Sequence, residues 1–151
     1  WAPSDHRVHD VFFADTEPRH IDATWIPLKP GMALISKDRP PLKDEFVELM
    51  EKNDWDLIES AEPHHTEETK PKLTKSTPYL SLNMLKIDRD TVCVMEQDEA
   101  QIKQLRDLGF DVIEAPSWAT GAFGGDLHCA TADVHRKGEC EDYFPNQIEG
   151  Y

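Results

Sequence analysis

Cys129 stands out as a candidate nucleophile because of the residues around it. It follows His128 directly in FGGDLHCATADVHRKG, residues 123 to 138, and two glycines come shortly before it. The thiolate is the nucleophilic form of cysteine, and nearby cations or backbone donors favour that form. The glycines let the backbone approach a ligand closely. A structural role is the alternative for Cys129, and it is the one we predict for Cys93, which lies in the strand-like run TVCVM.

A second stretch whose residues could take part in catalysis or binding is RHIDATW, residues 19 to 25. His20 and Asp22 alternate with Ile21 and Ala23 in this stretch. At the end of a strand, the two side chains would therefore point to the same side. An imidazole beside a carboxylate suits proton transfer and the recognition of a cation. The structural alternative is an ion pair at a strand edge.

Arg39 is a candidate for binding a substrate carboxylate. It lies after an expected strand, in SKDRPP, just before two prolines. Its guanidinium could hold a carboxylate through two parallel hydrogen bonds. The alternative is a surface arginine that pairs with Asp38 or Asp44.

We predict no metal site in this sequence. The pair His64-His65 invites such a reading, but no partner set at metal spacing accompanies it, so a solvated loop is the better interpretation. Cys129, His135 and Cys140 also lack any zinc-binding spacing. A phosphate-binding Gly-Lys motif is missing too, so nucleotide use is not supported.

The composition restricts the classes of partner. The chain has 151 residues and a formal net charge of −14, which disfavours binding to nucleic acid and to anionic membranes. No apolar run approaches the ~20 residues that cross a bilayer, and we find no signal peptide. Three cysteines are an odd and sparse set, which indicates a reducing compartment, the cytoplasm, rather than a disulfide framework.

Two similar segments must position the candidate residues. One covers about residues 23–61 and the other about 79–116, and each predicts a strand, a tight turn, a strand, a helix and a strand. The stretches DLIE from Asp56 and DVIE from Asp111 lie 55 residues apart. This period indicates a repeated β-β-α-β unit, although the same order also recurs by chance in α/β proteins.

Details within the second segment are specific enough to be checked. Leu80 to Ile87 is expected to pair with Thr91 to Met95 across the turn DRD. Asp98, with Gln101 three residues later, suits a helix start, and Gly109 fits the position just past the helix end. Residues 61–78 are expected to form a long surface loop, and 139–151 a mobile or loosely packed tail.

Four motifs occur in order and at suitable distances: HIDATW, KDRPP, LSLNML and FGGDLHCATADVHRKG. Together they resemble the C-terminal part of the glycine (arginine:glycine) amidinotransferase family. That family belongs to the guanidino-group-modifying enzymes, together with arginine deiminases and dimethylarginine hydrolases. The resemblance runs from about Arg7 to Gly138, nearly the whole chain.

The resemblance implies an α/β fold of repeated β-β-α-β modules, part of a pseudo-fivefold α/β propeller. The chain would be a single domain, residues 1–151, with the cysteine segment at 121–138 before the tail. A full family member is more than twice as long. The resemblance therefore implies a missing N-terminal half in a longer protein, or another copy of the chain as partner.

The resemblance also assigns roles to the candidate residues. Cys129 would attack the guanidino carbon of arginine, and His20 would act as general acid and base. The residues that would bind or line the substrate site are Asp22 for the guanidinium, Arg39 for the amino-acid carboxylate, and Ser76 and Thr77. No cofactor is implied.

The resulting function is transfer of an amidino group from arginine to an amine through an amidino-cysteine, by an enzyme that is part of a longer or assembled amidinotransferase. Two alternatives stay open. One is a guanidino hydrolase of the deiminase type, in which water replaces the amine. The other is a non-catalytic or incomplete guanidinium-binding module.

Overall fold

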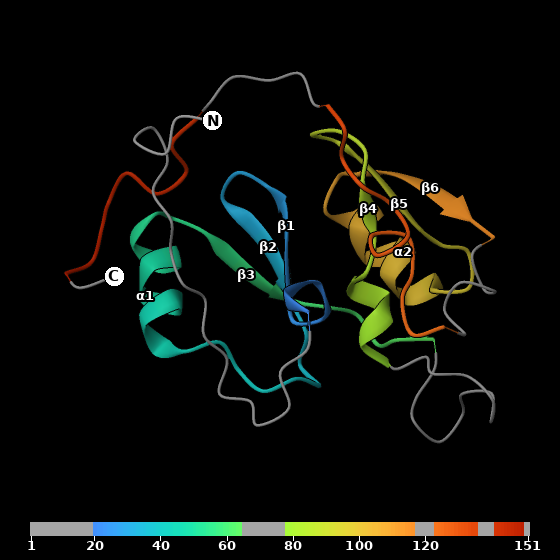
Figure 1. Ribbon diagram of the computed structural model, residues 1–151, viewed down its shortest axis with the longest axis horizontal. Helices are drawn as coiled ribbons and strands as arrows, with labels where there is room; N and C mark the ends of the chain where they lie inside the picture. Colours follow the sequence, from blue (N-terminus) through green and yellow to red (C-terminus); the bar gives the residue numbers. More distant parts are fainter. Residues whose placement is uncertain (1–19, 65–77, 117–122, 136–140, 150–151) are drawn as a thin grey trace.

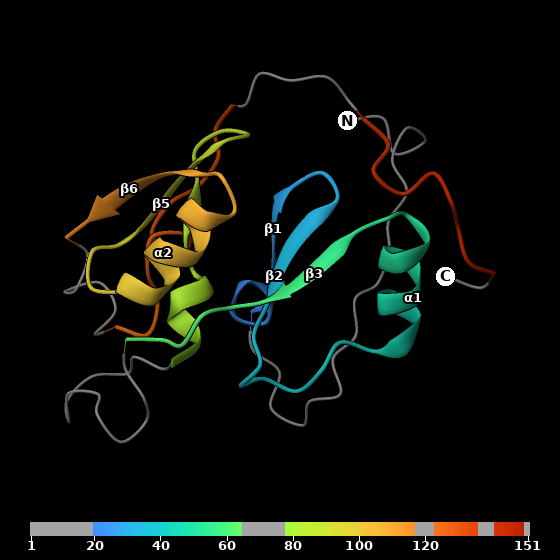
Figure 2. The ribbon, with the colours of Figure 1, turned by 180° about the vertical axis from the view of Figure 1, so that it is seen from behind.

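Two three-stranded sheets form the framework of the computed structural model, which describes residues 20–64, 78–116, 123–135 and 141–149. Each sheet is accompanied by one α-helix, and the two sheet-and-helix units lie side by side (Figures 1 and 2). Neither helix in the described part of the chain is long and apolar enough to span a membrane.

The first unit has the order β-β-α-β that its hydrophobic pattern predicts. Its elements are β1 (Trp25–Lys29), β2 (Met32–Ile35), α1 (Asp44–Lys52) and β3 (Asp56–Glu59). Strand β1 pairs antiparallel with β2, and β2 pairs parallel with β3. Gly31 adopts a φ of 79° in the turn between β1 and β2, a backbone conformation that favours glycine.

The second unit repeats this topology. Its elements are β4 (Leu85–Lys86), β5 (Thr91–Met95), α2 (Glu99–Asp107) and β6 (Asp111–Ala115). Strand β4 pairs antiparallel with β5, and β5 pairs parallel with β6. Helix α2 begins right after Asp98, as predicted, but the Asp98 carboxylate accepts a hydrogen bond from the backbone N–H of His64 and does not cap the helix. Gly109, with a φ of 87°, follows the helix end as expected.

The prediction of one strand from Leu80 to Ile87 is wrong. The segment begins as a 3-10 helix, η3 (Pro78–Leu82), and only Leu85 and Lys86 pair with β5. All residues from Leu80 to Met84 are buried, which a strand with one solvent-facing side would not allow. The backbone carbonyl of Asn83 accepts a hydrogen bond from the N–H of His128, so this part of the chain pairs with the cysteine segment instead of with β5.

A shared core joins the two units. Ile26, Leu28 and Leu34 on one face of the first sheet pack against the second unit. The second unit contributes a larger set of buried apolar side chains: Leu82, Met84, Val92, Val94, Ile102, Leu105 and Phe110. Because this core contains side chains from both units, their relative position is fixed by the burial of apolar surface.

A second core lies on the other face of the first sheet, under α1. Its buried members are Ala33, Leu42, Phe46, Leu49, Met50 and Trp55. Ala33 and Leu34 are consecutive residues of β2 but belong to different cores, because successive side chains of a strand point to opposite faces. The first sheet is therefore covered on both faces.

Residues 141–149 of the predicted tail contact the second core, although most of them are exposed. Phe144 stacks on Trp55 with ring centroids 5.3 Å apart and an interplanar angle of 3°. The indole N–H of Trp55 donates to the backbone carbonyl of Tyr143 over 3.2 Å, and Asn53 and Asn146 are joined by hydrogen bonds. The segment thus packs beside α1 (Figure 1), because its few apolar side chains extend the second core.

We expect Phe144→Ala to lower the free energy of unfolding by about 1–3 kcal/mol, since it removes a half-buried ring from the stack on Trp55. Denaturant titration followed by tryptophan fluorescence measures this change. The matched control is Phe123→Ala, because Phe123 is 86% exposed, and its effect should stay within about 0.5 kcal/mol. Equal effects of the two substitutions would contradict a packed tail.

Candidate active site

The candidate site lies where the two units meet. Three segments far apart in sequence converge there: the 3-10 helix η2 (Ile21–Ala23), the residues just after η3, and the segment 123–135. Figure 1 shows η2 between β1 and η3, and shows the segment with Cys129 running beside β4.

His20 and Asp22 are brought together by a turn, so the prediction that they lie on a strand end is wrong. The N–H of Ala23 donates to the carbonyl of His20 over 3.1 Å, and that of Thr24 to the carbonyl of Ile21 over 2.8 Å. These bonds close a 3-10 turn before β1 begins at Trp25. The His20 ring, the Asp22 carboxylate and the Cys129 sulfur nevertheless each have an atom within 4.8 Å of the other two.

Asp22 is the buried carboxylate of this group, with 8% of its surface exposed. Its Oδ2 lies 2.8 Å from Nδ1 of His128 and accepts a 2.8 Å hydrogen bond from Nδ2 of Asn83. The same oxygen lies 3.6 Å from Sγ of Cys129. One carboxylate oxygen therefore connects the imidazole of His128, the Asn83 amide and the thiol.

Cys129 and Cys93 occupy different environments, as predicted. Cys129 is a free, exposed thiol, whereas Cys93 is free but buried in β5. Burial raises the pKa of the Cys93 thiol, and the charge of Asp126 raises it further. Cys93 is therefore held in its unreactive thiol form.

Asn83 is a site residue to which the motif LSLNML alone assigned no role. Only 1% of its surface is exposed, between the core residues Leu82 and Met84. Its Oδ1 accepts hydrogen bonds of 3.0 Å from the backbone N–H groups of Asp126 and of Cys129. Its Nδ2 lies 3.1 Å from Sγ of Cys129. Polar residues inside a buried apolar run, Asn83 together with Ser81, were the available signal.

His128 is the other residue whose contact the sequence did not predict. Its side chain is 52% exposed and also reaches the Asp22 carboxylate. Adjacency to Cys129 was visible in the sequence, but the partner of His128 is 106 residues away in the chain.

Arg39 lies near the start of β1. Its Nε donates to Oγ1 of Thr24, at a distance of 3.5 Å, and its side chain is half-buried. Binding of a carboxylate by Arg39 stays a prediction. The other two predicted lining residues, Ser76 and Thr77, lie outside the described residues, as do His65 and Cys140.

Three of the site residues place potential metal-binding atoms within 4.8 Å of one another. His20, Asp22 and Cys129 form the group with this property among residues 20–64, 78–116, 123–135 and 141–149. These are also the residues to which the motif resemblance assigns nucleophilic, acid-base and cation-binding roles, so the cluster has an explanation that needs no metal. His64, the first of the predicted histidine pair, is exposed.

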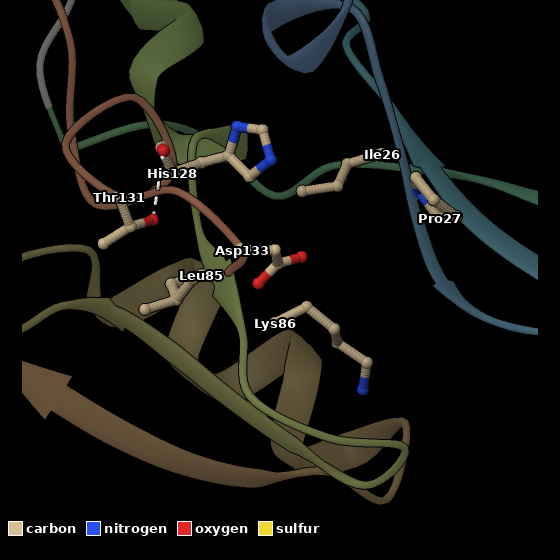
Figure 3. Close-up of a pocket in the computed structure, with 7 residues that line it drawn as sticks. All are labelled: Ile26, Pro27, Leu85, Lys86, His128, Thr131 and Asp133. Carbon is tan, nitrogen blue, oxygen red and sulfur yellow. Dashed lines mark hydrogen bonds between the residues drawn. The ribbon is translucent and has the colours of Figure 1, made fainter. Parts of the chain in front are cut away.

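A pocket of about 270 Å³ opens beside this group (Figure 3). Its walls are Ile26 and Pro27 of β1, Leu85 and Lys86 of β4, and His128, Thr131 and Asp133 of the cysteine segment. Oγ1 of Thr131 donates to the carbonyl of His128 over 3.1 Å and so braces the loop that borders the pocket. His128 thus contacts both the pocket and Asp22.

The fold and the site together indicate the kind of chemistry that this part of the chain suits. They place an exposed thiol, an imidazole and a buried carboxylate at the junction of two β-β-α-β units. A thiol beside a histidine suits nucleophilic catalysis, and a buried carboxylate suits the binding of a cationic substrate.

Known proteins with similar sequences are amidinotransferases. An L-arginine:L-lysine amidinotransferase of Pseudomonas savastanoi pv. phaseolicola is 34% identical over 140 residues, which cover 93% of this chain and 37% of that protein. The mitochondrial glycine amidinotransferase of Gallus gallus is 33% identical over 140 residues, 93% of this chain and 32% of its own length. No protein-family model matches the chain.

Solved structures agree. SxtG, an amidinotransferase from Microseira wollei in the saxitoxin biosynthetic pathway, superimposes with a TM-score of 0.79 and 30% identity over 93% of this chain and 38% of its own. The inosamine-phosphate amidinotransferase StrB1 from Streptomyces griseus gives a TM-score of 0.69 and 25% identity, covering 85% of this chain and 36% of its own. By sequence and by fold, the chain is therefore similar to amidinotransferases over most of its length, and it spans about a third of theirs.

Proposed function

We propose that the chain is the C-terminal, cysteine-bearing part of an amidinotransferase, and that it moves an amidino group from arginine to an amine through an amidino-cysteine at Cys129. The observation that carries this proposal is the convergence of His20, Asp22 and Cys129, whose functional atoms lie within 4.8 Å of one another. The relatedness to amidinotransferases supplies the reaction, and this convergence supplies the groups that it needs.

The first half of the reaction breaks the bond between the guanidino carbon and Nε of arginine. The guanidinium is a planar, resonance-stabilised cation and a poor electrophile, so it must be fixed close to the sulfur, and Asp22 does this by binding its N–H groups. The Cys129 thiolate attacks the guanidino carbon and a C–S bond forms. Nε takes a proton from His20 as the C–N bond breaks, and ornithine leaves with that nitrogen.

The second half reverses the chemistry with a different amine. His20, now neutral, takes a proton from the acceptor amine, and the amine nitrogen attacks the amidino carbon. A C–N bond forms, the C–S bond breaks, and the Cys129 thiolate is restored. The scheme is nucleophilic substitution: His20 gives a proton to the leaving nitrogen in the first half and regains one from the acceptor amine in the second.

The substrate is held by further groups in this proposal. Arg39 binds the carboxylate of the amino-acid substrate, and Ser76 and Thr77 line the site. The half-buried position of Arg39 beside Thr24, two residues after Asp22, supports its role. The reactive thiol of Cys129 must stay reduced, which favours a reducing compartment such as the cytoplasm.

The surrounding architecture is a propeller of β-β-α-β modules, of which this chain supplies the two described units. The repeated topology of the two units and their shared core support this arrangement. Further modules come from a longer protein that includes an N-terminal half, or from another copy of the chain.

The products released from arginine test the proposal. The protein is incubated with arginine and glycine or lysine as acceptor amines, and the products are separated by chromatography. We expect ornithine together with an amidinated acceptor. Citrulline and ammonia would indicate a deiminase-type hydrolase instead, because that reaction cleaves a terminal C–N bond. Arginine binding without any product would indicate a non-catalytic guanidinium-binding module.

Substitution of Gly125 tests whether the reaction depends on the present position of Cys129. A Cβ on Gly125 would lie 2.9 Å from Cβ and 3.4 Å from Sγ of Cys129, so Gly125→Ala must displace the cysteine. We expect ornithine release to fall about 100-fold, since small displacements of a reacting group are costly. The control is Gly109→Ala, where the Cβ meets nothing within 4 Å, so the strain of its φ of 87° should lower stability and leave the rate unchanged. Unchanged ornithine release by Gly125→Ala would contradict the geometry.

A further inference from the structure

We propose that Asn83 is a positioning residue for Cys129: its amide fixes the backbone of the cysteine segment and donates a hydrogen bond to the sulfur, which keeps the thiolate stable beside Asp22. The inference rests on the proposed function for its consequence, amidino transfer, but it concerns the reactivity of the thiol itself. It can therefore be tested without arginine.

The orientation of the Asn83 amide follows from its partners. Two backbone N–H groups, those of Asp126 and Cys129, point at one end of the amide at 3.0 Å each. A backbone N–H can only donate, so the atom facing them is Oδ1. The other end is therefore Nδ2, and its two hydrogens face Oδ2 of Asp22 at 2.8 Å and Sγ of Cys129 at 3.1 Å.

The amide thus uses its full hydrogen-bonding capacity, with two donors and two acceptor lone pairs all engaged. A buried polar side chain is costly unless it is satisfied, and Asn83 is 1% exposed. Its backbone is tied to the same segment, because its carbonyl accepts from the N–H of His128 over 3.1 Å. Asn83 therefore holds the cysteine segment at three backbone positions.

Electrostatics explain why the sulfur needs this donor. When Cys129 ionises, its sulfur carries a negative charge 3.6 Å from the carboxylate of Asp22. Two anions at this separation in a partly buried site disfavour each other. The Nδ2 group of Asn83 lies against both and offers one N–H to each, so it offsets part of that repulsion.

Other charged and titratable groups also face the sulfur or its segment. His20 approaches from the start of η2, and His128 and Asp126 belong to the cysteine segment itself. An imidazole can carry a positive charge, while Asp126 adds negative charge. The neutral Asn83 amide is a donor whose contribution does not change with pH, so its removal should shift the whole titration of the thiol.

The experiment measures the rate at which iodoacetamide alkylates Cys129, mapped by peptide mass spectrometry across a range of pH. The test variant is Asn83→Asp, which keeps an acceptor for the two backbone N–H groups and removes the donor to the sulfur. Even when protonated, the introduced carboxyl has a single proton, so it cannot donate to both Oδ2 of Asp22 and Sγ of Cys129. We expect the rate at neutral pH to fall about tenfold or more, and the midpoint of the pH profile to move upward by about one unit or more.

The control is Asn53→Asp, the same change at an amide that also bridges two segments, since Asn53 bonds to Leu49 and Asn146. Its Cys129 profile should match the unmodified protein. Cys93 reports folding within the same samples, because it is buried and should stay slow to react. If Asn83→Asp exposes Cys93, Asn83→Ser is measured instead. The shorter serine side chain cannot reach the sulfur, so we expect the same fall in the Cys129 alkylation rate.

A folded Asn83 variant in which Cys129 keeps the alkylation rate and the pH midpoint of the unmodified protein would overturn the inference. Asn83 would then only hold the cysteine segment in place. This result is separate from the fate of the proposed function. If the alkylation profile shifts as expected but arginine yields no ornithine, Asn83 keeps its role and amidino transfer is wrong.

Discussion

Replacing Cys129 by serine is expected to abolish arginine-dependent ornithine release, with a loss of about 1,000-fold or more, because the sulfur is the atom that carries the amidino group in the proposed reaction. A serine hydroxyl is nearly the same shape but is hardly ionised at neutral pH. The neighbouring groups Asn83 and Asp22 are arranged around an atom that must become an anion. Fold and substrate binding should survive the change.

Ornithine release by the two proteins, measured under identical conditions, gives the ratio. The matched control is Cys93→Ala, which removes a thiol that is buried in β5 and outside the site. It should lower stability by about 1–2 kcal/mol and leave the rate per folded molecule intact. Turnover that survives Cys129→Ser would mean that another group is the nucleophile.

Asp22→Asn is expected to weaken arginine binding by about 100-fold, because it removes the buried negative charge that faces the guanidinium in the proposed complex. The substitution is isosteric, so the carboxylate charge is the property that changes. It also changes the contact with His128, whose Nδ1 lies 2.8 Å from Oδ2 in the free protein. In the proposed complex, arginine would compete with that imidazole for the same carboxylate oxygen.

Titration calorimetry with arginine measures this effect directly, independent of turnover. Asp56→Asn, in β3, makes the same change in net charge at an exposed position and serves as the control. Its affinity should equal that of the unmodified protein. Equal affinities of the Asp22 and Asp56 variants would show that the guanidinium binds elsewhere.

The local patterns of the sequence predicted the two units well. The apolar stretches and tight turn of β1 and β2 and the helical spacing in α1 and α2 are short-range signals, and they do not depend on distant contacts. The prediction of a strand from Leu80 to Ile87 was wrong because short-range signals do not report distant contacts. The apolar residues of this stretch predict a strand, but burial on all sides and the hydrogen bond from His128 to Asn83 favour a 3-10 turn and an irregular backbone.

The site was predictable in its chemistry and less so in its geometry. His20, Asp22 and Cys129 were identified from residue type and resemblance, and the structure brings them together. The turn at η2 was missed, because a 3-10 helix of three residues leaves no periodic signature. The sequence alone assigned no role to Asn83, because its partners Asp22 and Cys129 lie 61 and 46 residues away along the chain.

Covalent transfer of the amidino group to Cys129 can be read from the mass of the Cys129 peptide after incubation with arginine labelled at the guanidino carbon. We expect the labelled carbon on Cys129 as a single amidino group, ornithine released in equal amount, and removal of the label by an added amine. A label that stays with the whole arginine skeleton on Cys129 would contradict amidino transfer in favour of a deiminase-type intermediate. An unlabelled Cys129 beside released ornithine would contradict the covalent role of this cysteine.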